Sequence, residues 1–437
     1  MYKKQVQYQL SGKRPKRPFY ILTTLLILIL SAIAATQLFA QETQQALSGG
    51  DELQVTCSAD HLQVVPVNAT ELTVSCMSNN TPDPTPTDEP QPPTPDPTDE
   101  PEPPSPDPTA TVPAPPPPSN NQGIWISSAE IASLPTSGSS WDNMLRAAQQ
   151  NTGSPNISNQ DDNTDVYVMA KALVYARTGE TRYRDDVVKA LRAAIGSESG
   201  GRTLALGRNL PPYIIAADLI NLSSTDPGLD RDFRSWLNSV RTKSLDGRSL
   251  IETHEDRPNN WGTHAGAARA AIAVYLGDTA DLTRTAAVFH GWLGDRSAYS
   301  GFSYGDLSWQ CNSSKPVGIN PSGCSKDGHN IDGALPEEMR RGGSFQWPPK
   351  STGYAWEGMQ GAIVQAEILH RAGFDTWNWE NQALRRAADF LYRIGWEASG
   401  DDRWQPWLLN SVYGTNYPAS AGTSPGKGMG WTDWTHQ

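Results

Sequence analysis

The side chains best suited to chemistry lie in the segment Arg257–His264, which leads directly into an apolar helix. Asn259, Asn260, Trp261 and His264 bring two amides, an indole and an imidazole to the start of that helix. Unpaired N–H groups and the positive end of the helix dipole favour an anion there, and residues four apart share one helix face. Asn260 and His264 could therefore hold a sugar carboxylate. An N-cap asparagine and a buried, hydrogen-bonded histidine would also explain the segment.

A second reactive group precedes another expected helix, at residues 355–372. Arg340 and Arg341 bring guanidinium groups, and Tyr354 brings a phenol, close to the start of that helix. Because arginine stays charged and stabilises a phenolate, Arg341 and Tyr354 could together move a proton. A surface arginine and a packing tyrosine are the alternative interpretation.

Helices must position both groups. A run with apolar spacing of three and four residues begins near Val166 and ends at Gly179. Similar patterns predict helices at 183–195, 212–222, 231–245, 264–276, 283–293, 355–372 and 381–394. Short turns between them predict antiparallel helical hairpins and an all-α fold. Periodicity alone leaves both a solenoid and an incomplete α/α toroid open.

The N-terminal part of the chain divides by composition into three segments before this domain. Residues 1–40 join a basic flank to about 20 apolar residues, which predicts export by a cleaved signal peptide or a signal anchor. Residues 41–79 form a small β-rich module, with period-two alternation at 53–57 and 72–76. Residues 80–119 hold about half of the 35 prolines with many acids, which predicts a semi-stiff stalk. The helical domain is expected at 120–437.

Cysteines and charge agree with an exported protein. An even cysteine count without metal-type spacing favours two disulfides, and the local pairing Cys57–Cys76 with Cys311–Cys324 is the one we expect of three. The formal net charge of −12 includes only −5 from residues 120–437, and no basic block suits nucleic acid.

Tryptophans are frequent in expected loops of the second half of the chain. Aromatic rings in such loops can stack on sugar faces, although they can equally fill gaps between helical hairpins. The six concerned are Trp309, Trp347, Trp404, Trp407, Trp431 and Trp434. As a group they favour a carbohydrate ligand.

The order of these motifs resembles the alginate lyase superfamily, which are polysaccharide lyases with an α/α toroid. The resemblance spans roughly residues 140–395 and rests on Asn259-Asn260-Trp261-Gly262, on Leu335-Pro-x-Glu-x-x-Arg341-Gly342, on Tyr354, and on His370-x-Ala-Gly-Phe-Asp-x-Trp377. It implies that Asn260 and His264 neutralise a uronate carboxylate, that Tyr354 donates and accepts the proton, and that Arg341 lies beside it. This chain departs from the family in two ways. Trp261 stands where the family commonly has histidine, which leaves His254 or His329 as alternative imidazoles, and the stretch from Arg341 to Tyr354 is longer than in the family.

The resulting hypothesis is β-elimination of a 4-linked polyuronate, alginate-like or glucuronan-like, without a metal or cofactor. Hydrogen bonds to the carboxylate stabilise the enolate-like charge that forms when the C5 proton leaves. Further substrate contacts are expected from Asn259, Trp261, Arg340, His329, Trp347 and Trp356. The expected protein is a monomer outside the cell or on its surface, with an acidic polysaccharide as substrate and membrane contact only if the N-terminal segment is uncleaved.

Two other classes stay open. A glycoside hydrolase would need two carboxylates beside the bond, and Asp161, Asp162, Asp165, Glu337 and Glu338 could supply them, although Asp161 and Asp162 also fit N-cap positions. The third class is a non-catalytic surface protein that binds glycans.

Overall fold

The computed structural model describes residues 61–68, 71–77, 122–421 and 426–437. The chain divides into two units, Met1–Pro103 and Pro104–Gln437. In the first unit, β1 (His61–Asn68) pairs antiparallel with β2 (Glu71–Met77). The second predicted strand, at 72–76, is thus confirmed, but its partner is β1. The other predicted strand, the Cys57 half of the first disulfide, the segment 1–40 and the stalk 80–119 lie outside the described residues.

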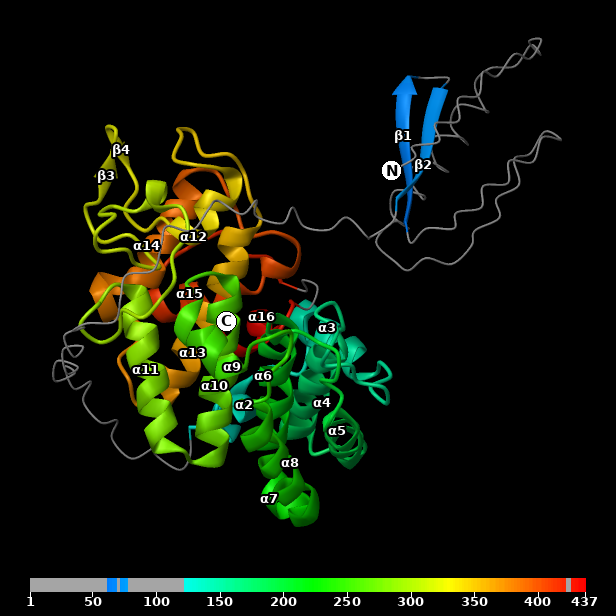
Figure 1. Cartoon of the computed structure of the whole chain (residues 1–437). Coiled ribbons are helices and arrows are strands. Elements are labelled where there is room, and N and C mark those ends of the chain that lie inside the picture. The colour runs from blue at the N-terminus through cyan, green and yellow to red at the C-terminus, as the bar shows by residue number, and fades with distance from the viewer. Residues whose placement is uncertain (1–60, 69–70, 78–121, 422–425) are drawn as a thin grey trace, which may run out of the picture. The chain divides into compact units, whose positions relative to one another are not determined.

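The described residues of the second unit are helical apart from one short hairpin and the connecting loops, as the periodicity predicts (Figure 1). Its longer helices are α3 (Ser139–Ala148), α4 (Thr164–Thr178), α5 (Thr181–Ala194), α6 (Thr203–Leu219), α8 (Pro227–Val240), α9 (Leu250–Asp256), α10 (Asn260–Leu276), α11 (Thr279–Leu293), α13 (Tyr354–Arg371), α14 (Trp379–Arg393) and α15 (Gln405–Tyr413). Shorter pieces are α2 (Ser128–Ser133), α7 (Leu222–Thr225), α12 (Pro336–Met339), α16 (Thr432–Thr435), the 3₁₀ turns η1 (Leu307–Trp309), η2 (Arg340–Gly342) and η3 (Gly400–Asp402), and the hairpin β3 (Ser325–Lys326) with β4 (His329–Asn330).

The long helices form two layers. In the inner layer α4 packs against α6, α6 against α10, and α10 against α13. These inner helices are buried on nearly all sides, which explains why apolar and small side chains make up most of each helix. Each of the outer helices α5, α8 and α14 has an apolar face and a charged face, and mainly the apolar face is buried. Figure 1 shows the succession from the cyan helices through green to the yellow-green α11.

The predicted helix boundaries fail where burial overrides local signals. The start predicted at residue 212 is wrong, because α6 begins at Thr203 and contains Pro211 and Pro212. Proline normally starts or breaks a helix, but here every residue from Thr203 to Ala217 is buried and packing holds the helix through both rings. The range predicted at 231–245 is also shifted, since Asp226 caps α8 with its side chain and the helix ends at Val240.

Two glycines allow the inner helices to approach closely around His264. A Cβ atom on Gly207 of α6 would lie 2.8 Å from the backbone carbon of His264, and one on Gly361 of α13 would lie 2.4 Å from its nitrogen. Either contact would push the helices apart. α6 and α13 therefore both pack closely against α10 at His264, which brings together side chains that are far apart in sequence.

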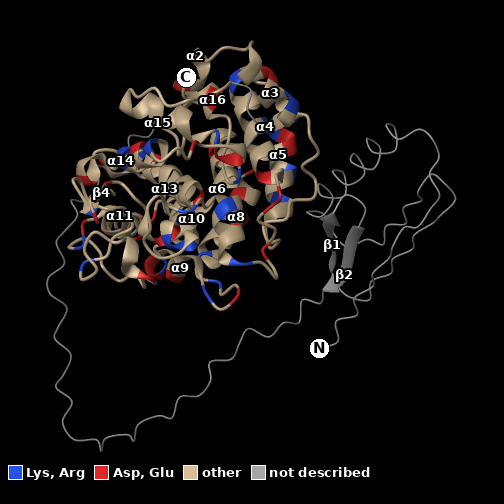
Figure 2. Cartoon of the chain, turned by 90° about the horizontal axis from the view of Figure 1, so that it is seen from above, with Lys and Arg blue, Asp and Glu red and all other residues tan. Residues whose placement is uncertain are grey.

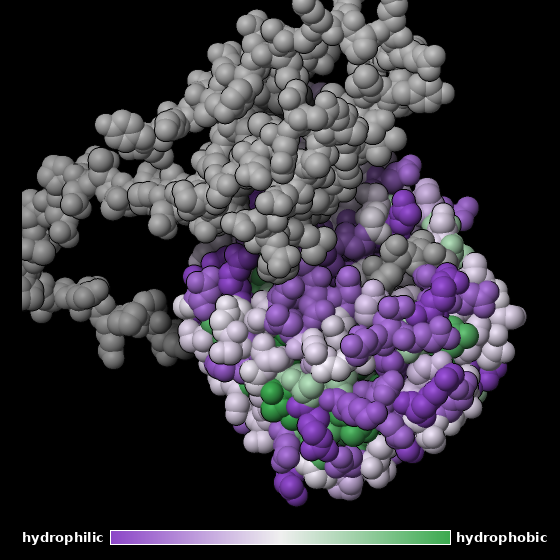
Figure 3. All heavy atoms as spheres, turned by 90° about the vertical axis from the view of Figure 1, so that its right-hand side faces the viewer, coloured by the Kyte–Doolittle hydropathy of each residue, from purple (hydrophilic) through white to green (hydrophobic). Residues whose placement is uncertain are grey.

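The surface of the domain is polar and mixed in charge. Figure 2 shows Lys and Arg interspersed with Asp and Glu across the helices. In Figure 3 the visible face of the helical domain is mainly hydrophilic, with a small apolar area. Within the described residues, no helix has the length and apolar character needed to span a bilayer. The predicted apolar segment at 19–40 lies outside that search.

Candidate active site

The start of α10 is already bound by an internal carboxyl group. Asn259 is the N-cap, and its side-chain oxygen accepts a hydrogen bond from the Trp261 N–H at 3.1 Å. The backbone N–H of Asn260 donates to Oε1 of Glu338 on α12. A carboxylate at a helix N-terminus is stabilised by the unpaired N–H groups and the dipole. The backbone position where an anion was expected is therefore filled by the Glu338 carboxyl group of the protein itself.

The Asn260 side chain points into a buried polar cluster. Its Nδ2 donates to Oε2 of Glu357 at 3.0 Å, and Arg208 on α6 donates to the same oxygen at 2.9 Å. Asn260 is 1% exposed and Arg208 is 2% exposed, whereas the Glu357 side chain is one-third exposed. Oδ1 of Asn260 is buried and has no partner. One carboxylate thus covers two buried donors.

His264 lies deeper in the same cluster. The Arg208 Nε–H donates to Nε2 of His264 at 3.4 Å, so the imidazole proton lies on Nδ1. Burial and the Arg208 charge lower the His264 pKa well below its usual 6.5. Asn260 and His264 are one turn apart as predicted, but His264 is only 3% exposed. A neutral, buried His264 contacts Arg208 and does not reach the surface.

Arg341 and Tyr354 meet as predicted. The Arg341 guanidinium lies over the Tyr354 ring, 3.8 Å from its centroid. Tyr354 is the first residue of α13 and is 39% exposed, which makes it one of two exposed large hydrophobic side chains among the described residues. The intervening loop folds back and brings the two side chains together despite the length of chain between them. Tyr354 is accessible to a substrate, and the Arg341 guanidinium makes a cation–π contact with its ring.

Glu338 joins the two groups. Its side chain lies between the start of α10 and Gly358. Gly358 is on α13, one turn after Tyr354, and a Cβ atom there would lie 3.1 Å from Oε1 of Glu338. Glu338 is 1% exposed, and its Oε2 has no partner. Burial raises its pKa to about 8, although the Arg341 charge and the Asn260 N–H act in the opposite direction. At neutral pH this carboxyl group is mainly protonated.

A second carboxyl group of raised pKa lies beside Glu357. Oδ1 of Asp402 accepts hydrogen bonds from the amides of Gln360 at 2.6 Å and Gln405 at 2.9 Å. Burial raises the Asp402 pKa to about 7, and the nearby Asp401 and Glu357 charges act in the same direction. The amide oxygens of both glutamines are buried without partners. Asp402 thus forms, with two glutamine amides, a second polar cluster close to Glu357.

The other predicted contact residues near the two helix starts differ in availability. Trp261 is partly exposed between the guanidinium groups of Arg257, at 4.7 Å, and Arg202, at 5.7 Å. Arg340 is bound to Oε2 of Glu337 at 2.7–2.8 Å, so its charge is neutralised internally. Trp356 is 5% exposed, and its indole donates to the Trp396 carbonyl, which makes it a packing residue and not a surface contact.

Trp347 and His329 form an exposed aromatic pair. Their rings stack 4.6 Å apart at 13°, and Trp347 is 37% exposed. Trp347 lies in the loop between Arg341 and Tyr354, and His329 lies on β4. The predicted disulfide Cys311–Cys324 is confirmed and closes the loop that leads into this hairpin. The hairpin presents His329 to the loop that carries Trp347.

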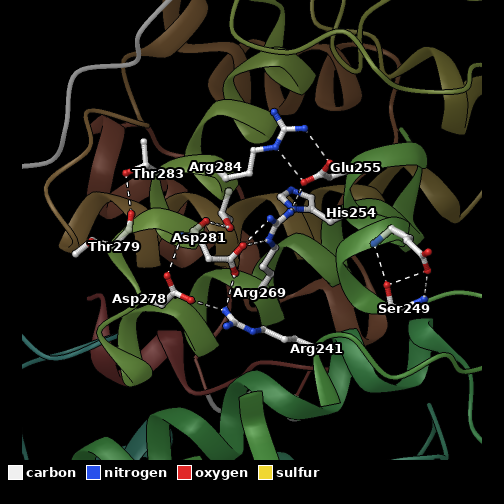
Figure 4. A network of polar contacts seen from close by, with 12 residues as sticks. Arg241, Ser249, His254, Glu255, Arg269, Asp278, Thr279, Asp281, Thr283 and Arg284 are labelled. Carbon is white, nitrogen blue, oxygen red and sulfur yellow. Dashed lines mark hydrogen bonds and ion pairs between the residues drawn. The ribbon is translucent and has the colours of Figure 1, made fainter. Parts of the chain in front are cut away.

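His254 belongs to a separate structural network (Figure 4). Its Nδ1 lies 3.5 Å from Arg269, and Arg269 is bound to Asp281 and Glu255 at 2.6–2.9 Å. Burial and the charges of Arg269 and Arg284 lower the His254 pKa well below 6.5. The network ties α9, α10 and α11 together. His254 is therefore a helix-packing residue.

Most of the loop tryptophans fill the core, so the prediction that they form sugar platforms as a group is wrong. Trp309, Trp404, Trp431 and Trp434 are at most 3% exposed, because helical hairpins leave gaps that large rings close. Three of these indoles donate to backbone carbonyls. Trp407 is partly buried. Only Trp347 of the six presents a largely accessible face.

The aspartates considered for hydrolysis do not join Glu337 or Glu338. Asp161 is exposed and bound to Lys427 at 2.7 Å, and Asp162 accepts from the Thr164 N–H at 3.0 Å, as a helix-start residue does. Asp165 is buried, and burial raises its pKa well above 3.8. None of the three bonds to either glutamate.

In the described part of the chain, one cluster of a histidine and two carboxylates has the residue types that bind metal ions. The His290 imidazole lies 3.2 Å from Glu380 and 3.6 Å from Asp295, through different ring nitrogens. It stacks on Trp379 at 4.4 Å. These side chains satisfy one another without an ion.

Sequence reasoning missed Arg208, Glu357 and Asp402. A signal for Arg208 exists, because it is the only charged residue in the long apolar run from Thr203 to Ala217. A charge in such a helix needs a buried partner. Nothing local identifies that partner as Glu357, which lies on a different helix far along the chain.

The site thus combines an accessible tyrosine beside an arginine with a buried amide and guanidinium from the inner helices. A family model matches part of the chain. Residues 116–297 match the model described as alginate lyase, which supports membership of the alginate lyase superfamily. The matched region contains Arg208, Asn260 and His264, and it ends before Arg341 and Tyr354. No curated protein matches the chain in sequence. The family supports a polysaccharide lyase acting on a polysaccharide substrate.

Proposed function

We propose that this protein cleaves a 4-linked polyuronate by β-elimination at Tyr354. The observation that carries the proposal is the Arg341 guanidinium stacked 3.8 Å from the exposed Tyr354 ring, beside the buried cluster of Asn260 and Arg208. A metal ion is not required for this reaction, because a phenolate base and hydrogen-bond donors supply its two chemical needs.

In the proposed reaction the Tyr354 phenolate takes the proton from C5 of the uronate. The electron pair of that C–H bond forms the C4–C5 double bond, and the C4–O4 bond breaks. The protonated Tyr354 returns its proton to O4 of the leaving chain. Arg341 lies where its charge stabilises the phenolate before the first transfer.

The uronate carboxylate must be neutralised while the C5 proton leaves, since negative charge builds on it. Asn260 is the proposed amide donor, and it becomes available when Glu357 moves away from it. His264 is proposed to act through Arg208, because its Nε2 accepts from that guanidinium and its ring is buried. Asn259 is partly exposed at the same helix start and is a further proposed contact.

We also propose that the helical layers close into an incomplete α/α toroid and that the protein is a monomer acting outside the cell or on its surface. The succession of inner helices α4, α6, α10 and α13 supports the toroid. The basic and apolar segment at residues 1–40, followed by the acidic proline-rich stalk, supports export.

The test combines a substrate panel with one substitution. Purified protein is incubated with alginate, glucuronan and other polyuronates, and the absorbance of the unsaturated uronate product is followed. Tyr354→Phe removes one oxygen and keeps the ring, so it should lower kcat by about 10²–10⁴-fold without changing the unfolding midpoint. Normal rates in this variant would refute Tyr354 as the base.

A glycoside hydrolase is the second candidate, and the raised pKa of Glu338 favours it, because a hydrolase needs a protonated carboxyl near a carboxylate such as Glu357. This reaction would add water and give saturated sugars. Products without ultraviolet absorbance, together with a mild effect of Tyr354→Phe, would support hydrolysis over elimination.

A further inference from the structure

The Glu357 carboxylate occupies a ready-made receptor for a carboxylate. Its Oε2 accepts from Asn260 Nδ2 at 3.0 Å and from the Arg208 guanidinium at 2.9 Å, two donors from different inner helices that converge on one oxygen. An amide and a guanidinium converging in this way are the donors that a sugar carboxylate requires. The side chain that fills the position belongs to the protein.

The two donors are held in place by contacts that do not involve Glu357. The Arg208 Nε–H is bound to His264, and the Asn260 backbone is bound to Glu338. Both donors are 1–2% exposed, so they cannot reorient into solvent. A receptor fixed in this way loses little freedom when it binds a ligand.

Glu357, in contrast, is free to leave. Its side chain is 33% exposed, while Arg208 and Asn260 beneath it are buried. Rotation of Glu357 toward solvent would uncover both donors. Glu357 also lies three residues after Tyr354 on the first turn of α13, which places the two side chains on neighbouring positions of one helix face. A ligand carboxylate at the Glu357 position would therefore lie beside the proposed base.

We propose that Arg208 and Asn260 form the receptor for the uronate carboxylate and that Glu357 occupies it until substrate displaces it. This inference rests on the proposed function for the identity of the ligand, a hexuronate. It adds Arg208 as a substrate-binding residue and makes Glu357 an internal competitor of the substrate. The site should therefore select acidic over neutral sugars, because a neutral sugar cannot replace the negative charge of Glu357 that neutralises Arg208.

The test measures binding and needs no turnover. Sodium glucuronate is titrated into the full chain and into Glu357→Gln, with neutral methyl glucoside as the control ligand. If Glu357 covers the donors about nine-tenths of the time, its removal should strengthen glucuronate binding about tenfold. In the double variant that carries both Glu357→Gln and Arg208→Gln, this gain in glucuronate affinity should be lost. Methyl glucoside should bind neither protein more tightly.

Glu255→Gln is the matched control, because it removes a partly exposed carboxylate bound to the buried Arg269 and leaves the Arg208 cluster intact. Glucuronate affinity should not change in it. Since Glu357→Gln leaves Arg208 without a charged partner, it could fail to fold. Glu357→Asp then decides, because the shorter side chain keeps its charge but is too short to reach both donors, and it should also bind glucuronate more tightly. Unchanged or weaker binding in whichever variant folds would overturn the proposal.

The outcomes separate this inference from the lyase proposal. Tighter glucuronate binding in the Glu357 variant without any unsaturated product would support the carboxylate receptor and refute the lyase. Unsaturated product together with unchanged glucuronate binding would keep the lyase and refute the receptor.

Discussion

Replacement of Glu338 by glutamine should make the folded protein more stable at neutral and alkaline pH. The wild-type carboxyl is 1% exposed, accepts the Asn260 N–H through Oε1 and leaves Oε2 without a partner. Its pKa is raised from 4.5 to about 8, chiefly by burial. Glutamine has nearly the same shape, accepts the same hydrogen bond and never ionises.

The sign and size of the effect follow from proton linkage. Below pH 4.5 the carboxyl is neutral in both the folded and unfolded chain. Between pH 4.5 and about 8 only the unfolded chain releases the proton, so the free energy of unfolding falls by about 1.4 kcal/mol per pH unit. Over the whole window the loss is on the order of 5 kcal/mol. Above pH 8 both states are ionised and the loss stays constant.

The assay is urea unfolding of wild type and Glu338→Gln at several pH values between about 5 and 8.5. The difference in unfolding free energy should grow with pH in favour of the variant, because all other titrating groups are shared and cancel. Glu255→Gln is the control, since the partial burial of that carboxyl is outweighed by hydrogen bonds from Arg284 and Arg269, which lower its pKa. It should lower stability by a nearly constant amount across this range, because the carboxyl is ionised in both states above its unfolded pKa. A Glu338→Gln difference that is constant across this range would refute the argument.

Three further predictions concern other parts of the chain. Trp347→Ala should raise KM for a polyuronate about two- to tenfold with little change in kcat or stability, because its exposed ring stacks on His329 alone, and Trp347→Phe should restore most of the affinity. Cys311→Ser should lower the free energy of unfolding by about 3 kcal/mol, and thiol labelling of the native wild type should modify neither Cys311 nor Cys324. A protein lacking residues 1–119 should unfold cooperatively and keep full activity, since the acidic proline-rich segment is too polar to form a core; loss of that cooperativity would refute the domain boundary.

Local signals determined most helix positions. Asn259 caps α10 with its side chain, Gly179 ends α4 in the left-handed conformation, and α13 begins within one residue of the prediction. These features depend on neighbouring residues in the chain, so a sequence pattern reports them directly. The prediction for α6 was wrong because Pro211 and Pro212 signal a boundary locally. Only the burial of that helix between two neighbours keeps it continuous.

The residue types of the candidate site were also visible in the sequence. Arg341 and Tyr354 meet as their order predicts, and Asn260 and His264 share a helix face because they are four residues apart. Their exposure was not visible. Asn260 and His264 are buried since α6 and α13 approach α10 at Gly207 and Gly361, which lie far from them along the chain.

The sequence by itself predicted the all-α domain with its asparagine–histidine and arginine–tyrosine groups, and the export segment and stalk predicted for residues 1–40 and 80–119 stay predictions. Tertiary structure alone decided that Glu338 binds the start of α10 and that Glu357 binds Arg208 and Asn260. The partners in these contacts lie on different helices and far apart along the chain, so no local pattern relates them. The physical reason is that a buried charge takes whichever partner the packed helices bring within hydrogen-bonding distance.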